Sequence, residues 1–198
     1  MSAIIHFVRH SKDEKAASHE RIVNAAAARI RESGTDQPGV AEIMRAAGLT
    51  HGGFYKHFDS REELIEEAVQ RALTERGPEL EELLAAADDP LAAFAEWYVS
   101  EAHRDNAGHG CGVVALGSDV SRVGGGAQEA YRVQVERYIA LLTSMLGGDE
   151  RAAAVTLSAM VGAVMMARAL GSTDRSDEIL RQVRVAVAER RVAPVSAD

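Results

Sequence analysis

The chain has 198 residues, of which 46% are hydrophobic, and its formal net charge is −8. This composition is typical of a folded protein with a substantial core and argues against disorder. No apolar stretch approaches the roughly 18 residues of a membrane span, and a single cysteine, Cys111, excludes an internal disulfide. We therefore expect a cytoplasmic protein with no membrane partner.

The charge is unevenly distributed. Residues 1–60 carry 8 Lys/Arg against 7 Asp/Glu and hold five of the seven histidines, whereas residues 61–198 carry 14 against 23. A DNA-binding region needs only a local positive surface, so the net negative charge does not exclude binding to nucleic acid.

The first predicted helix covers residues 18–33, with apolar residues at four-residue spacing and a glycine stop at Gly34. Before it stand Arg9, His10, Lys12 and Lys15, which would suit a minor groove or a DNA backbone. Charged runs at termini are usually solvated, so we interpret residues 1–17 as a flexible arm instead.

A second, short helix is predicted from Pro38 to Gly48, and a third over residues 50–57 after Thr50. Ser60 and Glu63 have the spacing of a capping box and start a fourth helix, which Gly77-Pro78 ends. Further helices are expected over 79–87, 90–104, 112–122, 127–147, 149–171 and 174–190. The sequence thus predicts an all-α fold of about nine helices, with a DNA-binding domain over 18–62 and a larger domain over 63–198.

The two short helices joined by "AAGLT" have the pattern of a helix-turn-helix, in which a glycine permits the tight turn. In that motif the second helix enters the major groove with its first residues at the base edges. Thr50 and His51 hold those first positions, while Tyr55, Lys56 and His57 follow with donors suited to phosphate oxygens.

The segment "AEIMRAAGLTHGGFYKHFDSREEL" resembles the helix-turn-helix signature of the tetracycline-repressor (TetR) family of bacterial transcription factors. Gly48, Gly52, Tyr55, His57 and Phe58 match the family pattern directly. The resemblance covers about residues 19–70, and the remainder is similar to the family only in length and helical content.

The resemblance implies that base and phosphate contacts come from this segment. The expected DNA-binding residues are Arg45, Thr50, His51, Gly52, Gly53, Tyr55, Lys56, His57 and Arg61. Three departures from the family pattern leave fewer side chains that can contact DNA. Gly53 stands where the family usually has Thr or Ser, Gly39 where a capping hydroxyl is common, and Ala41 where a polar residue is frequent. We therefore expect some reliance on DNA shape.

Family resemblance also implies an effector cavity between helices of the larger domain. The candidate lining residues are Trp97, Tyr98, Cys111, Tyr131, Met160 and Met165. Met and aromatic residues at helical spacing more often form core than cavity, so each candidate competes with a purely structural interpretation.

The segment "HRDNAGHGCG" brings His103, Asp105, His109 and Cys111 within nine residues. Such ligand types can bind zinc or copper, but no second cysteine is present and we predict no metal and no other cofactor. Cys111 as a thiol sensor is a competing interpretation, since neighbouring basic groups and a helix start would lower a thiol pKa.

No catalytic constellation stands out, so we expect no enzyme. The sequence predicts a homodimeric, ligand-responsive transcriptional regulator, most simply a repressor that binds a pseudo-palindromic operator in double-stranded DNA and is released by a small molecule. The alternative is a helical small-molecule-binding or thiol-based sensor protein with weak or no DNA binding.

Overall fold

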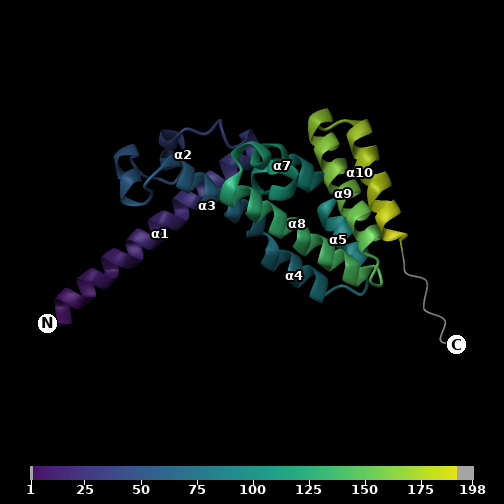
Figure 1. Cartoon of the computed structure of the whole chain (residues 1–198), viewed down its shortest axis with the longest axis horizontal. Helices are drawn as coiled ribbons and strands as arrows, with labels where there is room; N and C mark the ends of the chain where they lie inside the picture. Colours follow the sequence, from purple (N-terminus) through teal and green to yellow (C-terminus); the bar gives the residue numbers. More distant parts are fainter. Residues whose placement is uncertain (1, 191–198) are drawn as a thin grey trace.

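The computed structural model describes the backbone of residues 2–190 and the side chains of residues 12–190. Within that range the chain forms ten α-helices and two short 3-10 helices, with no strand. The molecule is elongated: a head at one end carries α1 and α2, and the helices α9 and α10 lie side by side at the other end (Figure 1).

Helix α1 (Ser2–Ser33) begins earlier than the predicted start at residue 18. Neither glycine nor proline occurs between residues 2 and 33, so nothing in this stretch ends a helix. Residues 2–17 therefore extend α1 beyond the head instead of forming the flexible arm that we expected (Figure 1). The side chains of Arg9 and His10 lie outside the described residues, and those of Lys12 and Lys15 are exposed.

Helix α2 (Val40–Ala46) ends in the predicted glycine turn. Gly48 has a φ of +74°, and its N–H and that of Leu49 donate to the carbonyls of Arg45 and Met44 at 3.0 and 2.8 Å. This pair of bonds is the Schellman arrangement, which favours glycine because a side chain would strain the left-handed backbone. It turns the chain into the next helix of the motif.

The predicted third helix is a 3-10 helix, η1 (His51–Lys56), rather than an α-helix. Gly52 and Gly53 lower the α-helical propensity of this six-residue segment by about 1 kcal/mol each, and 3-10 geometry is common in short pieces. Thr50 occupies the N-cap position without a side-chain capping hydrogen bond. The segment is therefore held in place mainly by the buried side chain of Phe54.

Helix α3 (Arg61–Thr74) connects the head to the body, packing on α1 and also on α7 and α8. Its start has the predicted capping arrangement in a modified form. The Ser60 hydroxyl accepts from the Glu63 N–H at 3.1 Å, while the Glu63 carboxylate accepts from the Asp59 N–H at 2.6 Å. Both bonds satisfy donors that would otherwise be free at a helix start.

The body contains the remaining helices: α4 (Gly77–Ala85), α5 (Pro90–Tyr98), α6 (Glu101–Asp105), η2 (Ala107–His109), α7 (Gly112–Val123), α8 (Gly125–Met145), α9 (Glu150–Leu170) and α10 (Asp174–Ala188). The single helix predicted over 90–104 is divided into α5 and α6. The Ser100 side chain accepts from the His103 N–H and so starts a new helix, because serine competes well for the N-cap position.

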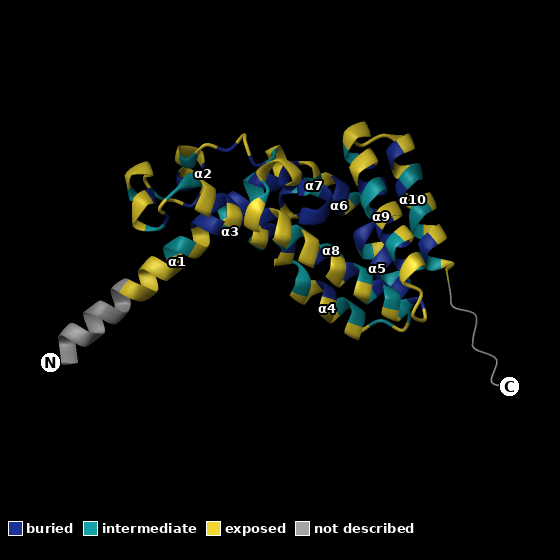
Figure 2. Ribbon diagram, viewed as in Figure 1, coloured by how far each residue is buried: buried dark blue, intermediate teal, exposed yellow. Residues whose placement is uncertain are grey.

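The core runs through the head and body without interruption, with buried residues facing inward along each helix (Figure 2). Among the described residues, α9 alone has the length and apolar composition of a membrane span. It packs against α8 and α10, and its buried side includes Leu157, Met160 and Val164. A core helix of a soluble protein can have the same length and apolar composition as a membrane span.

Candidate nucleic-acid interface and ligand cavities

The inner side of η1 is a packed aromatic cluster. Phe54 and Phe58 are each 2% exposed, and their rings stack with centroids 5.6 Å apart. The His19 ring of α1 stacks on Phe58 at 4.6 Å, and its Nε2 lies 2.8 Å from the Glu67 carboxylate of α3. The cluster therefore fixes η1 against α1 and α3 by its apolar side.

The outer side of η1 faces solvent. Tyr55 is 76% exposed, and Thr50, His51 and Lys56 are also exposed. A Cβ placed on Gly52 would meet no atom within 4 Å, so the backbone itself is open at that position. The structure thus brings these predicted DNA-binding residues to one exposed edge, where a ligand can approach both side chains and backbone.

Positive groups surround His57 at the border of this edge. The His57 ring is half-buried, and its Nδ1 has no hydrogen-bond partner among the described residues. Burial lowers the pKa of His57, and the nearby charges of His19, Lys15, Lys56 and Arg21 lower that pKa further. We call Lys15, Arg21, Lys56 and His57 the basic surface.

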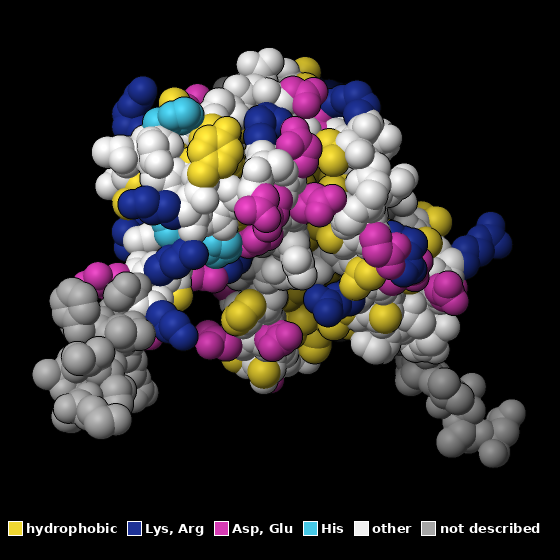
Figure 3. All heavy atoms as spheres, turned by 60° about the vertical axis from the view of Figure 1, so that its left-hand side comes forward, with side chains coloured by type: hydrophobic (Ala, Val, Ile, Leu, Met, Phe, Trp, Pro, Cys, Tyr) yellow, Lys and Arg dark blue, Asp and Glu magenta, His cyan; other side chains and the backbone are white. Residues whose placement is uncertain are grey.

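Two members of the basic surface, Lys15 and Arg21, were not predicted as DNA-binding residues. Both come from α1: Arg21 lies within the predicted helix, whereas Lys15 is placed beside His57 only because α1 continues before residue 18. Figure 3 shows Lys, Arg and His side chains gathered on one side of the head. The absence of helix breakers before residue 18 was the sequence signal that would have indicated the position of Lys15.

Arg61 has an intramolecular role that the sequence did not indicate. Its Nη2 donates to the Thr35 carbonyl at 2.6 Å and lies 3.3 Å from the Asp36 carbonyl, so it fastens the loop between α1 and α2 to the start of α3. Its contact with phosphate stays a prediction. Arg45 is exposed on α2 and leaves its guanidinium accessible.

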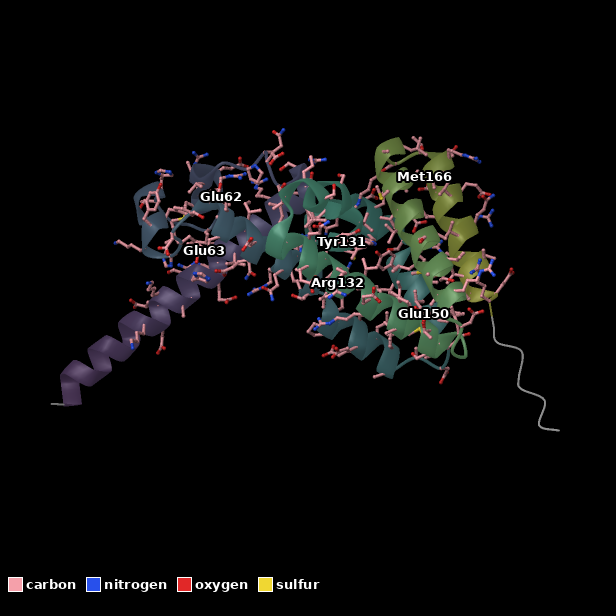
Figure 4. All side chains as sticks on the ribbon, viewed as in Figure 1. Glu62, Glu63, Tyr131, Arg132, Glu150 and Met166 are labelled. Carbon is pink, nitrogen blue, oxygen red and sulfur yellow. The ribbon has the colours of Figure 1, made fainter. Side chains whose placement is uncertain are left out.

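The six predicted effector residues do not share one cavity. Trp97 lines a cavity of about 460 Å³ with Arg76 and Glu79, Met165 lines another of about 510 Å³, and Tyr131 lines a third of about 480 Å³. Figure 4 shows Tyr131 on α8 in the middle of the body. Tyr98, Cys111 and Met160 are buried in the core, at 0%, 4% and 0% exposure. Helical spacing alone does not reveal which side of a helix faces a cavity.

Trp97 is held at the rim of its cavity by polar contacts. Its indole N–H donates to Glu79 at 2.9 Å, and the Arg76 guanidinium lies 4.1 Å from the centroid of the ring. The Arg76 and Trp97 hydrogen bonds lower the pKa of the Glu79 carboxyl. Arginine over an indole face is a favourable cation–π contact. The polar groups of Arg76, Glu79 and Trp97 therefore already have partners within this set of three.

A buried polar group, His103, also lines that cavity. His103 donates from Nδ1 to the Tyr98 carbonyl at 2.6 Å and accepts at Nε2 from the Cys111 N–H at 2.9 Å. Burial lowers the pKa of His103 to about 4. The neutral ring therefore joins α5 to the start of α7, and its two nitrogens are occupied by backbone groups rather than by a metal.

The Cys111 thiol lies 3.5 Å from the Tyr138 hydroxyl. Burial is the main cause that raises the pKa of both Tyr98 and Tyr138, and the adjacent Cys111 adds to the effect. A reactive thiol requires access and a stabilised thiolate. Cys111 is 4% exposed, so its thiol is closed to solvent, which favours a structural thiol over a sensor.

Arg31, which no sequence pattern indicated, joins the head to the body. Its side chain is 1% exposed and pairs with Glu75 at 2.8 Å. It also donates to the Gly108 carbonyl at 2.6 Å and lies 3.4 Å from that of Ala72. A cation near the end of α1 thus contacts η2 and the last turn of α3. Its partners are 41 to 77 residues away in the chain, so no local pattern shows them.

Comparison with known proteins decides the family. Residues 22–68 match the model of the family described as bacterial regulatory proteins, tetR family. This match assigns the helix-turn-helix region of the chain, residues 22–68, to the TetR family.

Two curated relatives support this assignment. The HTH-type transcriptional repressor BepR of Brucella suis is 35% identical over 80 residues, which are 40% of this chain and 37% of BepR. The uncharacterized HTH-type transcriptional regulator YvdT of Bacillus subtilis is 33% identical over 61 residues, or 31% of each protein. The matches thus span about a third of these relatives.

Solved structures extend the similarity to the whole fold. A TetR transcriptional regulator from Chloroflexus aurantiacus has a TM-score of 0.78 at 23% identity, over 89% of this chain and 97% of its own. The reduced form of E. coli NemR has a TM-score of 0.75 at 20% identity, over 91% and 99%. At such identities the likeness shows the shared TetR fold alone, with an amino-terminal helix-turn-helix and a helical body.

Proposed function

We propose that this TetR-family chain is a ligand-responsive transcriptional repressor that binds a pseudo-palindromic operator as a homodimer. The observation that carries the proposal is the exposed edge of η1, with Thr50, His51 and the open backbone at Gly52 beside the basic surface. In this arrangement η1 lies in the major groove while cations from α1 and η1 contact the flanking phosphates.

The proposed domain division is 18–62 for DNA binding and 63–198 for effector binding and dimerisation. Both α1 and α3 extend beyond the head, since α1 also packs on η2 and α7 while α3 packs on α7 and α8. Movement of the body is therefore transmitted to η1 through these two helices. A useful effector needs a tenfold or greater preference, about 1.4 kcal/mol, for the state that does not bind DNA.

The second copy is proposed to dock on α9. Val155, Gly162, Met166 and Leu170 recur at four- to seven-residue spacing along the helix, which places them on one side, and the three larger ones are 44–52% exposed. Figure 4 shows Met166 on α9, at the end of the molecule opposite the head. Val185 of the adjacent α10 is 43% exposed. Small and apolar residues in this pattern suit a helix-to-helix interface between identical chains.

Operator selection from random DNA tests the proposal. We expect a consensus of two inverted half-sites whose centres are about 34–36 Å apart, one helical turn. Selection that returns no enriched sequence would support the alternative of a helical sensor without DNA binding.

Sedimentation of Met166→Glu tests the dimer. A buried glutamate in an apolar interface is expensive, so this variant should sediment as a monomer and lose affinity for the operator. Ser121→Glu is the control, because Ser121 is exposed on α7 and does not belong to the proposed face of α9. A Met166→Glu variant that remains dimeric would exclude this face of α9.

A further inference from the structure

The cavity of about 510 Å³ brings together residues from both ends of the chain. Its lining comes from the end of α1, from α6 and η2, from the start of α7, and from the last turns of α9. Its volume lies within the range of about 300–1,000 Å³ that small-molecule sites usually have. The lining is partly apolar, with Val114, Ala115 and Met165, and partly charged, with three arginines.

Two of the three arginines are already paired. Arg31 pairs with Glu75, and Arg104 pairs with Asp105 and Asp177. The two acids of the lining are also engaged, since Asp105 binds Arg104 and Glu32 accepts from Arg29 at 3.0 Å. These groups therefore neutralise one another.

Arg168 differs from these arginines. None of the ion pairs between described side chains includes it, and its Nε is buried without a hydrogen-bond partner in the same part of the chain. Its Nη2 donates to the His103 carbonyl at 2.9 Å. Burial lowers the pKa of this guanidinium, and the nearby Arg31 lowers it further. A cation in such surroundings is stabilised by any anion that reaches it.

The backbone makes room for this guanidinium. A Cβ on Gly110 would lie 2.3 Å from Arg168 Nη2 and 3.0 Å from His103 Cδ2. The φ of Gly110 is −78°, a value that any residue adopts, so glycine is needed here for space and not for backbone conformation. Gly110 thus allows Arg168 to lie beside the backbone at the cavity.

We propose that this cavity binds a small organic anion, a carboxylate that carries an apolar group, and that Arg168 is its principal cation. The planar guanidinium matches a carboxylate, and Val114, Ala115 and Met165 accept the apolar part. The assignment of this anion as the effector rests on the proposed function. Arg31 and Glu32 of the cavity belong to α1, and this helix connects the cavity to the head. Binding itself is measured without DNA.

Calorimetric titration of the full chain with octanoate and with benzoate tests the proposal. We expect saturable binding of at least one carboxylate and no binding of the neutral analogues octanamide and benzamide. Arg168→Met, checked for folding by circular dichroism, should weaken carboxylate binding by at least about tenfold, as expected for loss of a charge-assisted pair. Absence of carboxylate binding, or equal binding of the amides, would overturn the proposal.

A second variant keeps the test decisive if Arg168→Met does not fold. Met165 is 51% exposed, so Met165→Glu should fold and place a negative charge at the cavity. It should weaken carboxylate binding by at least about tenfold through like-charge repulsion. Ser158→Glu, two turns earlier on the same side of α9 and outside the lining, should bind as the parent does. Equal binding by Met165→Glu and Ser158→Glu would place the anion elsewhere and overturn the proposal.

Discussion

The cations of the head and those of the body serve different purposes. In the head, Lys56 and Arg45 are exposed. At the junction of head and body the Arg31 side chain is 1% exposed, and in the body that of Arg104 is 6% exposed; carboxylates hold both, and a backbone carbonyl also holds Arg31. An exposed cation costs little when it is unpaired and stays available to a phosphate, whereas a buried one must be compensated within the fold. Cations that remain uncompensated therefore indicate where a partner binds.

The two sides of η1 give the largest expected contrast within the head. Phe54→Ala should lower the free energy of unfolding by about 3–5 kcal/mol, because it leaves a cavity beside Phe58 and the core. Tyr55→Ala, on the outer side, should change it by less than about 0.5 kcal/mol. Urea denaturation measures both. Similar losses in the two variants would show that η1 does not have a buried side and a solvent side.

The body contains a buried titratable group, His103, whose protonation makes the stability of the chain depend on pH. His103 stays neutral in the folded chain because its pKa is about 4, whereas in the unfolded chain it takes up a proton below about pH 6.5. The unfolded state thus binds more protons as the pH falls, and stability decreases. We expect this residue to account for a loss of about 2 kcal/mol between pH 7 and pH 5.

His103→Gln should remove that part of the pH dependence, even if the variant is less stable at neutral pH. His109→Gln is the control, because this histidine lies in the same segment but is exposed. Denaturation curves at pH 7, 6 and 5 compare the three chains. A His103→Gln variant with the slope of the parent would contradict the assignment of the effect to His103.

Sequence readout is expected from the head alone. His51→Ala should relax the preference for one base pair in each half-site, at a cost of about 1–3 kcal/mol for the preferred operator, because the donor at the base edge is lost. Tyr55→Phe should weaken binding to all sequences alike, since it removes a phosphate contact. Selection from random DNA measures both, and an unchanged consensus for His51→Ala would exclude readout by this residue.

The smallest expected effect concerns Gly53, where the family usually has Thr or Ser. A Cβ there would lie 3.6 Å from Met44 Cε, an ordinary contact. Gly53→Ser should therefore stabilise the chain by about 0.5–1 kcal/mol through reduced backbone entropy and strengthen operator binding if the new hydroxyl reaches a phosphate. Gly48→Ala is the contrast: with φ at +74° it should destabilise the chain by about 1 kcal/mol. A destabilised Gly53→Ser variant would show that the second glycine is required.

The sequence predicted short-range features better than long-range ones for a physical reason. The turn at Gly48, the cap at Ser60 and the pair Phe54–Phe58 depend on residues within a few positions of one another. The roles of Arg31, Arg61 and Arg168 depend on carbonyls and cavities formed by distant segments. The early start of α1 was visible in the sequence, but charge was given more weight than the absence of helix breakers.

Salt dependence of operator binding tests the central proposal most directly. The logarithm of the binding constant should fall linearly with the logarithm of salt concentration, by about 0.9 for each phosphate that is neutralised. Lys56→Ala removes one cation from each protomer of the dimer, so the slope should be shallower by about 2. A slope identical to that of the parent chain would mean that this edge of the head does not contact the DNA backbone.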